Sequence, residues 1–339
     1  MRLSELTTLR LGGPAGAVTE ARDEAELVEA AQGDDVLLVA GGSNLVVADA
    51  GWPGTVARVL TRGVEEREAD GRVELTAAAG EEWEPFVAHC VAEGLAGVES
   101  LSGIPGSLGA TPIQNVGAYG QEVAETITAV RALDRATGET AVLAPEDCGF
   151  AYRSSAFKRH PGRWVVLAVS FALERRELSG PLGYAELART LDVKPGEGAP
   201  LAEVREAVLG LRRGKGMVLD PDDLDTVSAG SFFTNPILSE AEFDALEARA
   251  PARPPRFPEP DGRVKTSAAW LIERAGFHKA HGNPAGIAIS SKHTLALTNR
   301  GGGTTAELLA LAREIAGGVR ERFGVTLEPE PTLVGVGWP

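Results

Sequence analysis

The chain has 339 residues, of which 43% are hydrophobic and 24% are charged, and its formal net charge at pH 7 is −15. This composition is that of a globular protein rather than a disordered or fibrous one, and the length allows two or three domains. A surface this acidic, without a compensating basic stripe, disfavours nucleic acid and anionic membranes as partners.

Cysteine content and hydropathy indicate the compartment. The two cysteines, Cys90 and Cys148, lie far apart and form no CxxC motif, so neither a disulfide framework nor a zinc site is expected. No apolar run approaches the roughly 20 residues that span a bilayer, and the N-terminal MRLSELTTLRLGG lacks the apolar core of a signal peptide. We therefore expect a cytoplasmic protein without membrane insertion.

Hydrophobic spacing divides the first part of the chain into short strands and helices. The expected strands are 15–18, 36–40 and several within 55–79, where Asp70-Gly71 is a hairpin turn signal, and the expected helices are 24–32 and 81–95. Residues 101–120 contain five glycines and two prolines. That composition predicts an extended loop with one helical turn at most.

The rest of the chain mixes strands and helices without strict βαβ alternation. The expected elements are a hairpin over 127–143, a buried strand at 163–174, a Gly- and Pro-rich break at 179–200, a helix over 200–215, a turn-rich strand at 230–236, a Pro-rich loop or extended segment at 249–262, strands within 285–298, and helices over 267–276 and 304–324. This order predicts an α+β fold with several small sheets.

Two glycine-rich segments are candidates for binding a cofactor. In GGSN (41–44) paired glycines free the backbone to point successive N–H groups at a pyrophosphate, although a plain turn after a strand is the alternative. Neither G-x-G-x-x-G nor the P-loop motif occurs. The loop at 101–120 is long enough to imply a binding function and suits a flat ligand, with Gln114 and Asn115 as polar contacts. A compact Ω-loop is its alternative.

Other polar motifs have structural explanations. In GGGTTAE (301–307), Thr304 and Glu307 fit a capping box at a helix start, which we prefer to a phosphate site. His278 and His281 share a helical spacing, but a zinc site needs further ligands that the sequence does not offer. No metal is expected.

Three polar residues lie in apolar or tightly turned settings, namely Arg153 in FAYRSSAFK, Ser231 in AGSFFTNP and Glu330 in LEPEPTLVG. Taken singly, each has a structural reading as a salt-bridge partner, a strand-end cap or a rim charge.

At these residues the sequence resembles the UDP-N-acetylenolpyruvoylglucosamine reductase family of peptidoglycan precursor synthesis, in the subtype with a tyrosine loop. The match runs in order from TTLRLGG and GGSNLVV through SGIPGSLGATPIQNVGAYG, YRSSAFK, AGSFFTNP and KTSAAWLIERAG to LEPEPTLVG, over essentially the whole chain. The resemblance implies three domains, and we expect a monomer. Residues 1–62 with 326–339, and 63–195, would bind FAD as in vanillyl-alcohol-oxidase-type flavoproteins, and 196–325 would bind the UDP-sugar.

By the resemblance, GGSN (41–44) and the loop at 101–120 hold the pyrophosphate and the isoalloxazine of FAD. The FAD is expected to be non-covalent, because residues 101–120 contain no histidine or cysteine. The residues expected to contact it are Gly41, Gly42, Ser43, Asn44, Leu45, Gly103, Ile104, Pro105, Gly106, Ser107, Gly109, Ala110, Gln114, Asn115, Gly117, Ala118 and Tyr119.

The implied reaction is reduction of UDP-N-acetylglucosamine enolpyruvate to UDP-N-acetylmuramate with NADPH as co-substrate. Hydride passes from flavin N5 to the vinyl carbon, so negative charge develops at the adjacent carbon and in the carboxylate. By matching position, Arg153 would stabilise that carboxylate, because guanidinium is always charged and meets carboxylates in a fork. Glu330 would assist if it is protonated or bridged to Arg153, and Ser231 would supply the proton.

Matching positions for the UDP group are Tyr184 in PLGYAEL, Asn235 in FFTNP and Lys265 in RVKTSAAW. The alternative for Tyr184 is that it begins the following helix. Lys215 lies close to a family lysine, and the sequence leaves open which lysine meets the diphosphate. Phe257 stands where some relatives have tyrosine, so its contact with the nucleotide would be stacking alone.

Two other functions compete with this reading. One is another flavoprotein oxidase of the same superfamily, which would have no joint use for Ser231, Arg153 and Glu330. The other is a non-catalytic nucleotide-sugar-binding protein, which would need no flavin loops.

Overall fold

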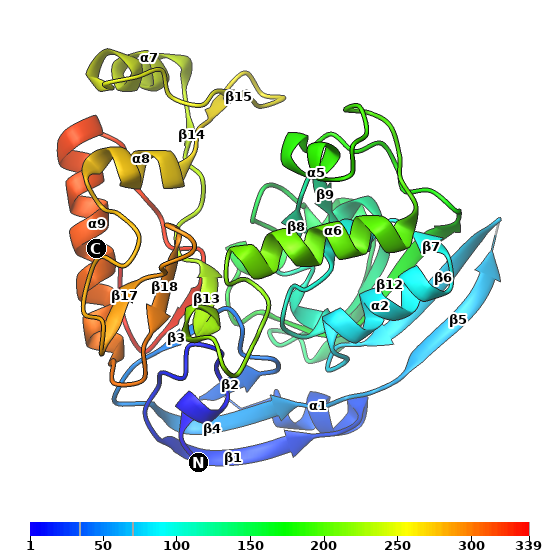
Figure 1. Ribbon diagram of the computed structural model, residues 1–339. Coiled ribbons are helices and arrows are strands. Elements are labelled where there is room, and N and C mark those ends of the chain that lie inside the picture. The colour runs from blue at the N-terminus through cyan, green and yellow to red at the C-terminus, as the bar shows by residue number, and fades with distance from the viewer. Residues whose placement is uncertain (34, 70, 339) are drawn as a thin grey trace. The chain divides into compact units, whose positions relative to one another are not determined.

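The chain divides into two compact units in the computed structural model, in which residues 1–33, 35–69 and 71–338 are described (Figure 1). Unit 1 comprises Met1–Pro14, Gly42–Trp52 and Leu219–Pro339, and unit 2 comprises Ala15–Gly41 and Pro53–Val218. Each unit has its own hydrophobic core.

The main sheet of unit 2 is antiparallel, in the order β11-β10-β12-β6-β5, with β7 paired to β12. Its strands are β5 (Val64–Ala69), β6 (Arg72–Ala78), β7 (Leu95–Ala96), β10 (Ile127–Asp134), β11 (Glu139–Leu143) and β12 (Trp164–Arg175). The central strand β12 is buried along most of its length, which explains its nearly continuous apolar sequence. The hairpins β5–β6 and β10–β11 are those expected from the sequence, although the turn residue Asp70 lies outside the described residues.

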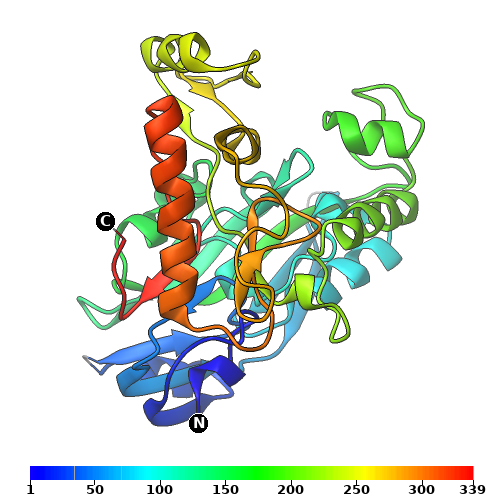
Figure 2. The same cartoon turned by 60° about the vertical axis from the view of Figure 1, so that its left-hand side comes forward.

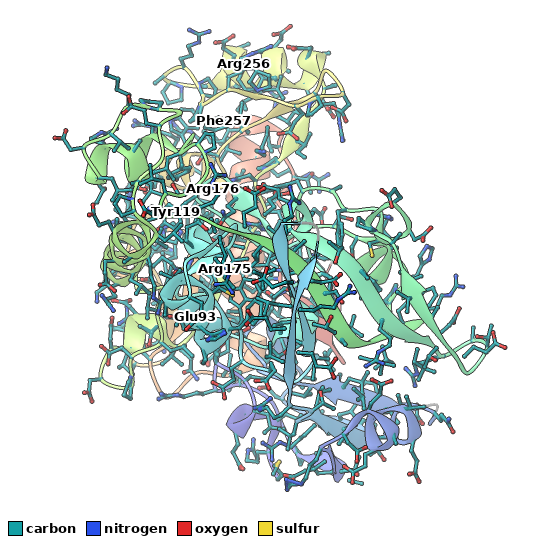
Figure 3. All side chains as sticks on the ribbon, turned by 90° about the vertical axis from the view of Figure 1, so that its right-hand side faces the viewer. Glu93, Tyr119, Arg175, Arg176, Arg256 and Phe257 are labelled. Atoms are coloured by element: carbon teal, nitrogen blue, oxygen red, sulfur yellow. The ribbon has the colours of Figure 1, made fainter. Side chains whose placement is uncertain are left out.

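Two helices of unit 2, α2 (Trp83–Ala92) and α6 (Leu201–Gly214), contact each other and lie side by side (Figure 1). Trp83 and Phe86 of α2 pack against Phe171 of β12, with ring centroids 6.0 and 5.3 Å from it. At the end of α2, Arg175 Nη1 donates to the Glu93 carbonyl at 3.2 Å, which ties the helix to β12 (Figure 3). The helix α6 buries one amphipathic stripe, as its spacing predicts.

A second sheet of unit 2 has the order β1-β4-β2. Its strands are β1 (Ala15–Ala21), β2 (Val36–Val39) and β4 (Trp52–Val59), and α1 (Glu24–Ala30) begins at the capping residue Asp23. The shorter elements of unit 2 are η2 (Glu99–Leu101), η3 (Leu108–Ala110), β8 (Gly117–Ala118), β9 (Gln121–Glu122), η4 (Val123–Glu125), α3 (Pro145–Cys148), α4 (Ala156–Arg159) and α5 (Ala185–Thr190).

The core of unit 1 lies between a small sheet and two helices. The sheet has the order β13-β18-β17, with β13 (Ser228–Ser231), β17 (Ile287–Ile289) and β18 (Ala296–Asn299). Figure 2 shows α9 (Thr305–Phe323) running beside β17 and β18, which it contacts, and α8 (Ala268–Ala275) packs on α9. The C-terminal strand β19 (Thr332–Val334) pairs in parallel with β3 (Leu45–Val47). The remaining element at the start of unit 1 is η1 (Leu3–Glu5).

A second small sheet of unit 1 has the order β14-β16-β15. Its strands are β14 (Ile237–Leu238), β16 (Val264–Lys265) and β15 (Phe257–Pro258), joined by α7 (Glu240–Arg249); η5 (Leu224–Thr226) precedes β13.

The α+β class expected from the sequence is confirmed, whereas several details differ. The break expected at 179–200 contains the helix α5, and α7 has no counterpart among the expected elements. The expected three-domain bounds stay a prediction; in the structure α6 groups with unit 2, because it packs on α2 and η2. Among the described residues, no helix is both long and apolar enough to cross a membrane.

Candidate functional site

The glycine-rich loop at 101–120 is bound to residues 79–83, which lead into α2. Three backbone hydrogen bonds do this: Trp83 N to Gly106 O at 3.0 Å, Leu108 N to Glu81 O at 2.8 Å, and Gly109 N to Ala79 O at 2.9 Å. Glycine is required at position 109, since a Cβ there would lie 2.5 Å from the Cβ of Ala79 and 2.8 Å from its Cα. As expected, the loop has one helical turn, η3.

The surroundings of Gly41 and Ser107 show whether the residues at this loop are suited to bind a dinucleotide. A Cβ on Gly41 would lie 2.6 Å from the Cα of Gly106, so any side chain at position 41 would collide with the loop. Ser107 is 4% exposed, and its hydroxyl has no hydrogen-bond partner within 1–33, 35–69 and 71–338. A buried hydroxyl without a partner calls for a polar ligand or water. The residues present therefore fit a cofactor that is approached closely by backbone.

In unit 1, the rest of the GGSN segment is held from both sides. Gly42 has φ +59°, and a Cβ there would lie 1.7 Å from the Leu6 carbonyl oxygen, so only glycine fits. Thr8 N donates to Gly42 O at 3.2 Å and Thr332 N donates to Asn44 O at 2.9 Å. Contacts of Ser43, Asn44 and Leu45 with FAD stay predictions.

Asn115 holds the far end of the loop in place. It is 1% exposed, and its amide donates to Glu122 Oε2 at 2.6 Å and to the Ala151 carbonyl at 3.2 Å while accepting from Ala124 N at 3.2 Å. The structure thus shows a structural use for this side chain. Cofactor contacts of Asn115 and Gln114, and those of the other expected loop residues, remain predictions.

Arg153 is anchored to the same loop in unit 2. It has φ +50°, in the left-handed region that ordinary side chains avoid. Its Nη1 donates to Asn115 O at 3.3 Å and its Nη2 donates to Gly117 O. The guanidinium also lies 5.2 Å from the ring centroid of Tyr152. The loop carbonyls therefore fix the orientation of this cation.

Ser231 and Glu330 are brought together in unit 1. Ser231 ends β13, where it pairs with Ala296 of β18, and the next residue, Phe232, donates its N–H to Leu295 O at 2.8 Å. Glu330 N donates to Phe232 O at 2.8 Å, so the serine and the glutamate lie on adjacent backbone segments. Arg153 belongs to unit 2, and its approach to Ser231 stays a prediction.

Apolar packing surrounds the Ser231 segment. Phe232 and Phe233 are each 1% exposed, and their rings lie 6.3 and 6.0 Å from that of Trp338. The rings pack at the end of β13, where Ser231 itself is half-buried, and shielding of Ser231 from water by Phe232 and Phe233 stays a prediction.

Asp225 supports β13 and was not singled out by the sequence. Its carboxylate accepts from Ser291 N at 2.8 Å, from Ser291 Oγ at 2.5 Å and from Arg300 Nη2 at 2.7 Å, which ties the start of β13 to both ends of the β17–β18 hairpin. Burial opposes its charge, yet the bonds from Ser291 and the charge of Arg300 hold the pKa of Asp225 below its usual value. The only sequence feature that could have drawn attention to Asp225 is the acidic run at 220–225, and such runs usually face solvent.

The candidate UDP-binding residues of unit 2 form one cluster. Tyr184 is at the N-cap position of α5, which agrees with the alternative that it begins the following helix. Its side chain is nevertheless 42% exposed, and its ring meets the Tyr119 ring edge-on with the centroids 5.2 Å apart. Lys215 Nζ lies 5.6 Å from the Tyr119 ring centroid and 2.6 Å from Glu186 Oε2. Burial raises the pKa of Tyr119; burial opposes the charge of Lys215, but the bond to Glu186 raises its pKa overall. Both groups therefore keep their neutral-pH forms, a phenol and an ammonium.

Two of the candidate UDP-binding residues of unit 1, Lys265 and Phe257, lie on the β14-β16-β15 sheet. Lys265 is opposite Phe257 on one side and Ile237 on the other, and its Nζ lies 2.7 Å from Glu259 Oε1. Phe257 is 49% exposed (Figure 3), so its ring is available for stacking. Asn235 accepts from Ala268 N at 3.0 Å, which places it at the start of α8.

The GGGTTAE segment is a helix start, as expected. Thr304 Oγ1 accepts from Glu307 N at 3.2 Å, and Thr304 N donates to Glu307 Oε2 at 2.8 Å, which is the predicted capping box. Asp49 accepts from Thr305 N and Ala306 N at 2.8 and 2.9 Å. A carboxylate of the protein therefore occupies the position where a phosphate would bind.

We expect the purified protein to be yellow with releasable FAD, because residues 101–120 contain no histidine or cysteine that could form a covalent link there. Acid precipitation should leave the flavin in the supernatant, measured by its visible spectrum. Colour that stays in the pellet would contradict this, as would a colourless protein that added FAD does not reconstitute.

Comparison with known proteins shows the family of the chain. Residues 221–334 match the family model of the UDP-N-acetylenolpyruvoylglucosamine reductase C-terminal domain, and residues 16–144 match that of an FAD binding domain. The UDP-N-acetylenolpyruvoylglucosamine reductases of Salinispora arenicola and Thermobifida fusca are 58% and 56% identical, over 98% of this chain and 94% and 97% of their own. The crystal structure of the reductase from Thermus caldophilus aligns with a TM-score of 0.67 at 25% identity, over 98% of this chain and 97% of that one.

Proposed function

Because this chain belongs to the UDP-N-acetylenolpyruvoylglucosamine reductase family, we propose that it reduces UDP-N-acetylglucosamine enolpyruvate to UDP-N-acetylmuramate with NADPH and FAD. The observation that carries the assignment of its catalytic residues is the backbone pairing that sets Glu330 beside the Ser231 segment. The enzyme would act in the cytoplasm as a monomer on small-molecule substrates, with neither nucleic acid nor membrane as a partner.

The chemistry sets the tasks of the protein residues. When bound, FAD supplies a hydride that originates from NADPH. Its addition to the terminal vinyl carbon places negative charge on the adjacent carbon and on the carboxylate. Preorganised positive charge at that carboxylate and a proton for the adjacent carbon are therefore the two needs of the transition state.

Arg153 would meet the first need. Its guanidinium is always charged and presents paired donors that match a carboxylate. Two carbonyls of the 115–117 segment already fix its orientation, so little reorganisation accompanies the reaction.

Ser231 would meet the second need by donating its hydroxyl proton. Serine is a weak acid at neutral pH, but a carbanion conjugated with a carboxylate is basic enough to take its proton, directly or through water. The adjacent Glu330 would orient the serine or bridge to Arg153. Packing of Phe232 and Phe233 would keep bulk water from the β13 end.

The UDP group would be held by short-range contacts, because a net charge of −15 opposes a diphosphate at long range. Tyr184 and Lys215 of unit 2 would contact the diphosphate, and Lys265 and Asn235 of unit 1 would add polar contacts. Phe257 would stack on the nucleotide. A mobile Tyr184 loop would also exclude water from the site.

Tyr184→Phe is expected to weaken binding of the UDP-sugar by about 10- to 150-fold, the value of one hydrogen bond to a charged group. The change removes the hydroxyl and keeps the ring that packs on Tyr119. Calorimetry of oxidised enzyme with substrate measures the affinity, and unchanged flavin content serves as the control. A variant that binds the substrate as tightly as wild type would show that this hydroxyl is not a ligand contact.

The overall reaction is tested by mixing the protein, NADPH and the enolpyruvyl sugar. Oxidation of NADPH should require the sugar, and mass spectrometry should find a product that carries two more hydrogens. If NADPH oxidation is independent of the sugar and the sugar is recovered unchanged, the proposed function is wrong.

A further inference from the structure

The first glycine of the 101–120 loop is pressed against helix α6. Gly103 has φ +74°, and a Cβ there would lie 2.8 Å from Leu209 Cδ2 and 3.0 Å from Val218 Cγ2. The positive φ strains any larger residue at this position, and a side chain there would also displace Leu209 and Val218. The start of the loop therefore takes its position from α6 and the residues after it.

Charged side chains hold both backbone groups of Gly103. Its N–H donates to Glu84 Oε2 on α2, and its carbonyl accepts from Arg212 Nη2 on α6 at 3.3 Å. The same Nη2 donates to the Met217 carbonyl at 2.8 Å, just after α6 ends. Arg205, on α6 as well, pairs through Nη2 with Glu84 Oε1. We call Glu84, Arg205 and Arg212 the Gly103 clamp.

The Gly103 clamp has an excess of positive charge. Two guanidinium groups face one carboxylate, and the Nε of Arg212 and the Nη1 of Arg205 are buried without a hydrogen-bond partner in the described part of the chain. Burial lowers the pKa of Arg212 to about 10, which still leaves it charged at neutral pH. An incompletely paired cation whose guanidinium nitrogens are partly buried is costly, so its presence at a binding loop indicates a compensating anion.

We propose that Arg212 is a positioning residue for the cofactor, which fixes Gly103 and places an incompletely paired positive charge at the 101–120 loop that is expected to bind FAD. The inference rests on the proposed function, since it takes the 101–120 loop as the flavin loop. It also accounts for binding of an anionic cofactor by a chain of net charge −15, because a local cation offsets the opposing long-range field.

Arg212→Gln is expected to weaken FAD binding by about 10- to 100-fold, the range for loss of a charged hydrogen bond together with its charge. Flavin-free protein is prepared by acid or high-salt treatment and titrated with FAD, and the quenching of flavin fluorescence gives the Kd. Arg212→Lys keeps the charge and loses the fork, so its Kd should lie between those of wild type and the glutamine variant. Arg213→Gln, the exposed next residue on α6, is the matched control and should bind as wild type does.

The outcomes separate this inference from the proposed function. If Arg212→Gln binds FAD as tightly as wild type, even with a lowered melting temperature of the flavin-free protein, Arg212 supports only the fold and the inference is wrong. If Arg212→Gln does not fold, the FAD affinity of Arg212→Lys is the test. Wild-type affinity for FAD in Arg212→Lys would show that Arg212 does not position the cofactor, and weaker affinity would support that role. Failure of the wild-type protein to bind FAD would contradict the proposed function itself.

Discussion

Replacement of Ser231 by alanine is expected to slow reoxidation of the reduced enzyme by the enolpyruvyl sugar by about 10²–10⁴-fold, the range of general acid catalysis. Reduction by NADPH should be nearly unchanged, because that half-reaction needs no proton at the substrate carbon. The backbone of β13 should be unaffected, since its pairing with Ala296 does not involve the hydroxyl.

Stopped-flow absorbance of the flavin separates the two half-reactions of the Ser231 variant. Ser231→Cys is the companion variant, because a thiol retains an ionisable hydrogen and should recover part of the rate. Equal slowing of both half-reactions in Ser231→Ala would mean that the serine shapes the flavin site instead of donating a proton.

Arg153→Lys is expected to slow the same oxidative half-reaction by about 10²–10³-fold, as loss of one preorganised transition-state donor does. Lysine keeps the charge but cannot hold two loop carbonyls and a carboxylate in one plane. Rates are measured at saturating sugar, so that weaker binding is distinguished from slower chemistry.

Arg159→Lys is the matched control for Arg153. Arg159 lies on α4 and donates to the Gly149 carbonyl at 3.0 Å, so the same substitution is made nearby on another carbonyl contact. Both variants should retain FAD. An Arg153→Lys enzyme with a wild-type oxidative rate would remove the arginine from the catalytic step.

Local sequence signals predicted local structure well. The Thr304–Glu307 capping box and the hairpin over 127–143 depend on residues a few positions apart, and both are confirmed. The helix α7 also begins with a capping box, formed by Ser239 and Glu242. Charged residues such as Glu240 and Asp244 interrupt its apolar spacing, so the sequence shows no clear apolar stripe. Its weak amphipathic pattern explains why it was missed.

Long-range pairings could not be predicted from the sequence. The Arg205–Glu84 ion pair joins residues 121 positions apart, and no sequence pattern near either residue predicts the pairing. The same holds for Asp225, whose partner Arg300 lies 75 positions away. Motifs marked the segments that form the candidate site, whereas the buried charges that hold those segments became visible only in the structure.

The central claim is that the enolpyruvyl sugar is the electron acceptor of the reduced enzyme, and an anaerobic single turnover tests it most directly. Wild-type enzyme reduced by one equivalent of NADPH is mixed with one equivalent of the sugar, while the flavin absorbance is followed. We predict that the flavin is reoxidised without oxygen and that one equivalent of UDP-N-acetylmuramate forms. Enzyme that stays reduced with the sugar, yet is reoxidised rapidly by air while the sugar is recovered intact, would contradict the account.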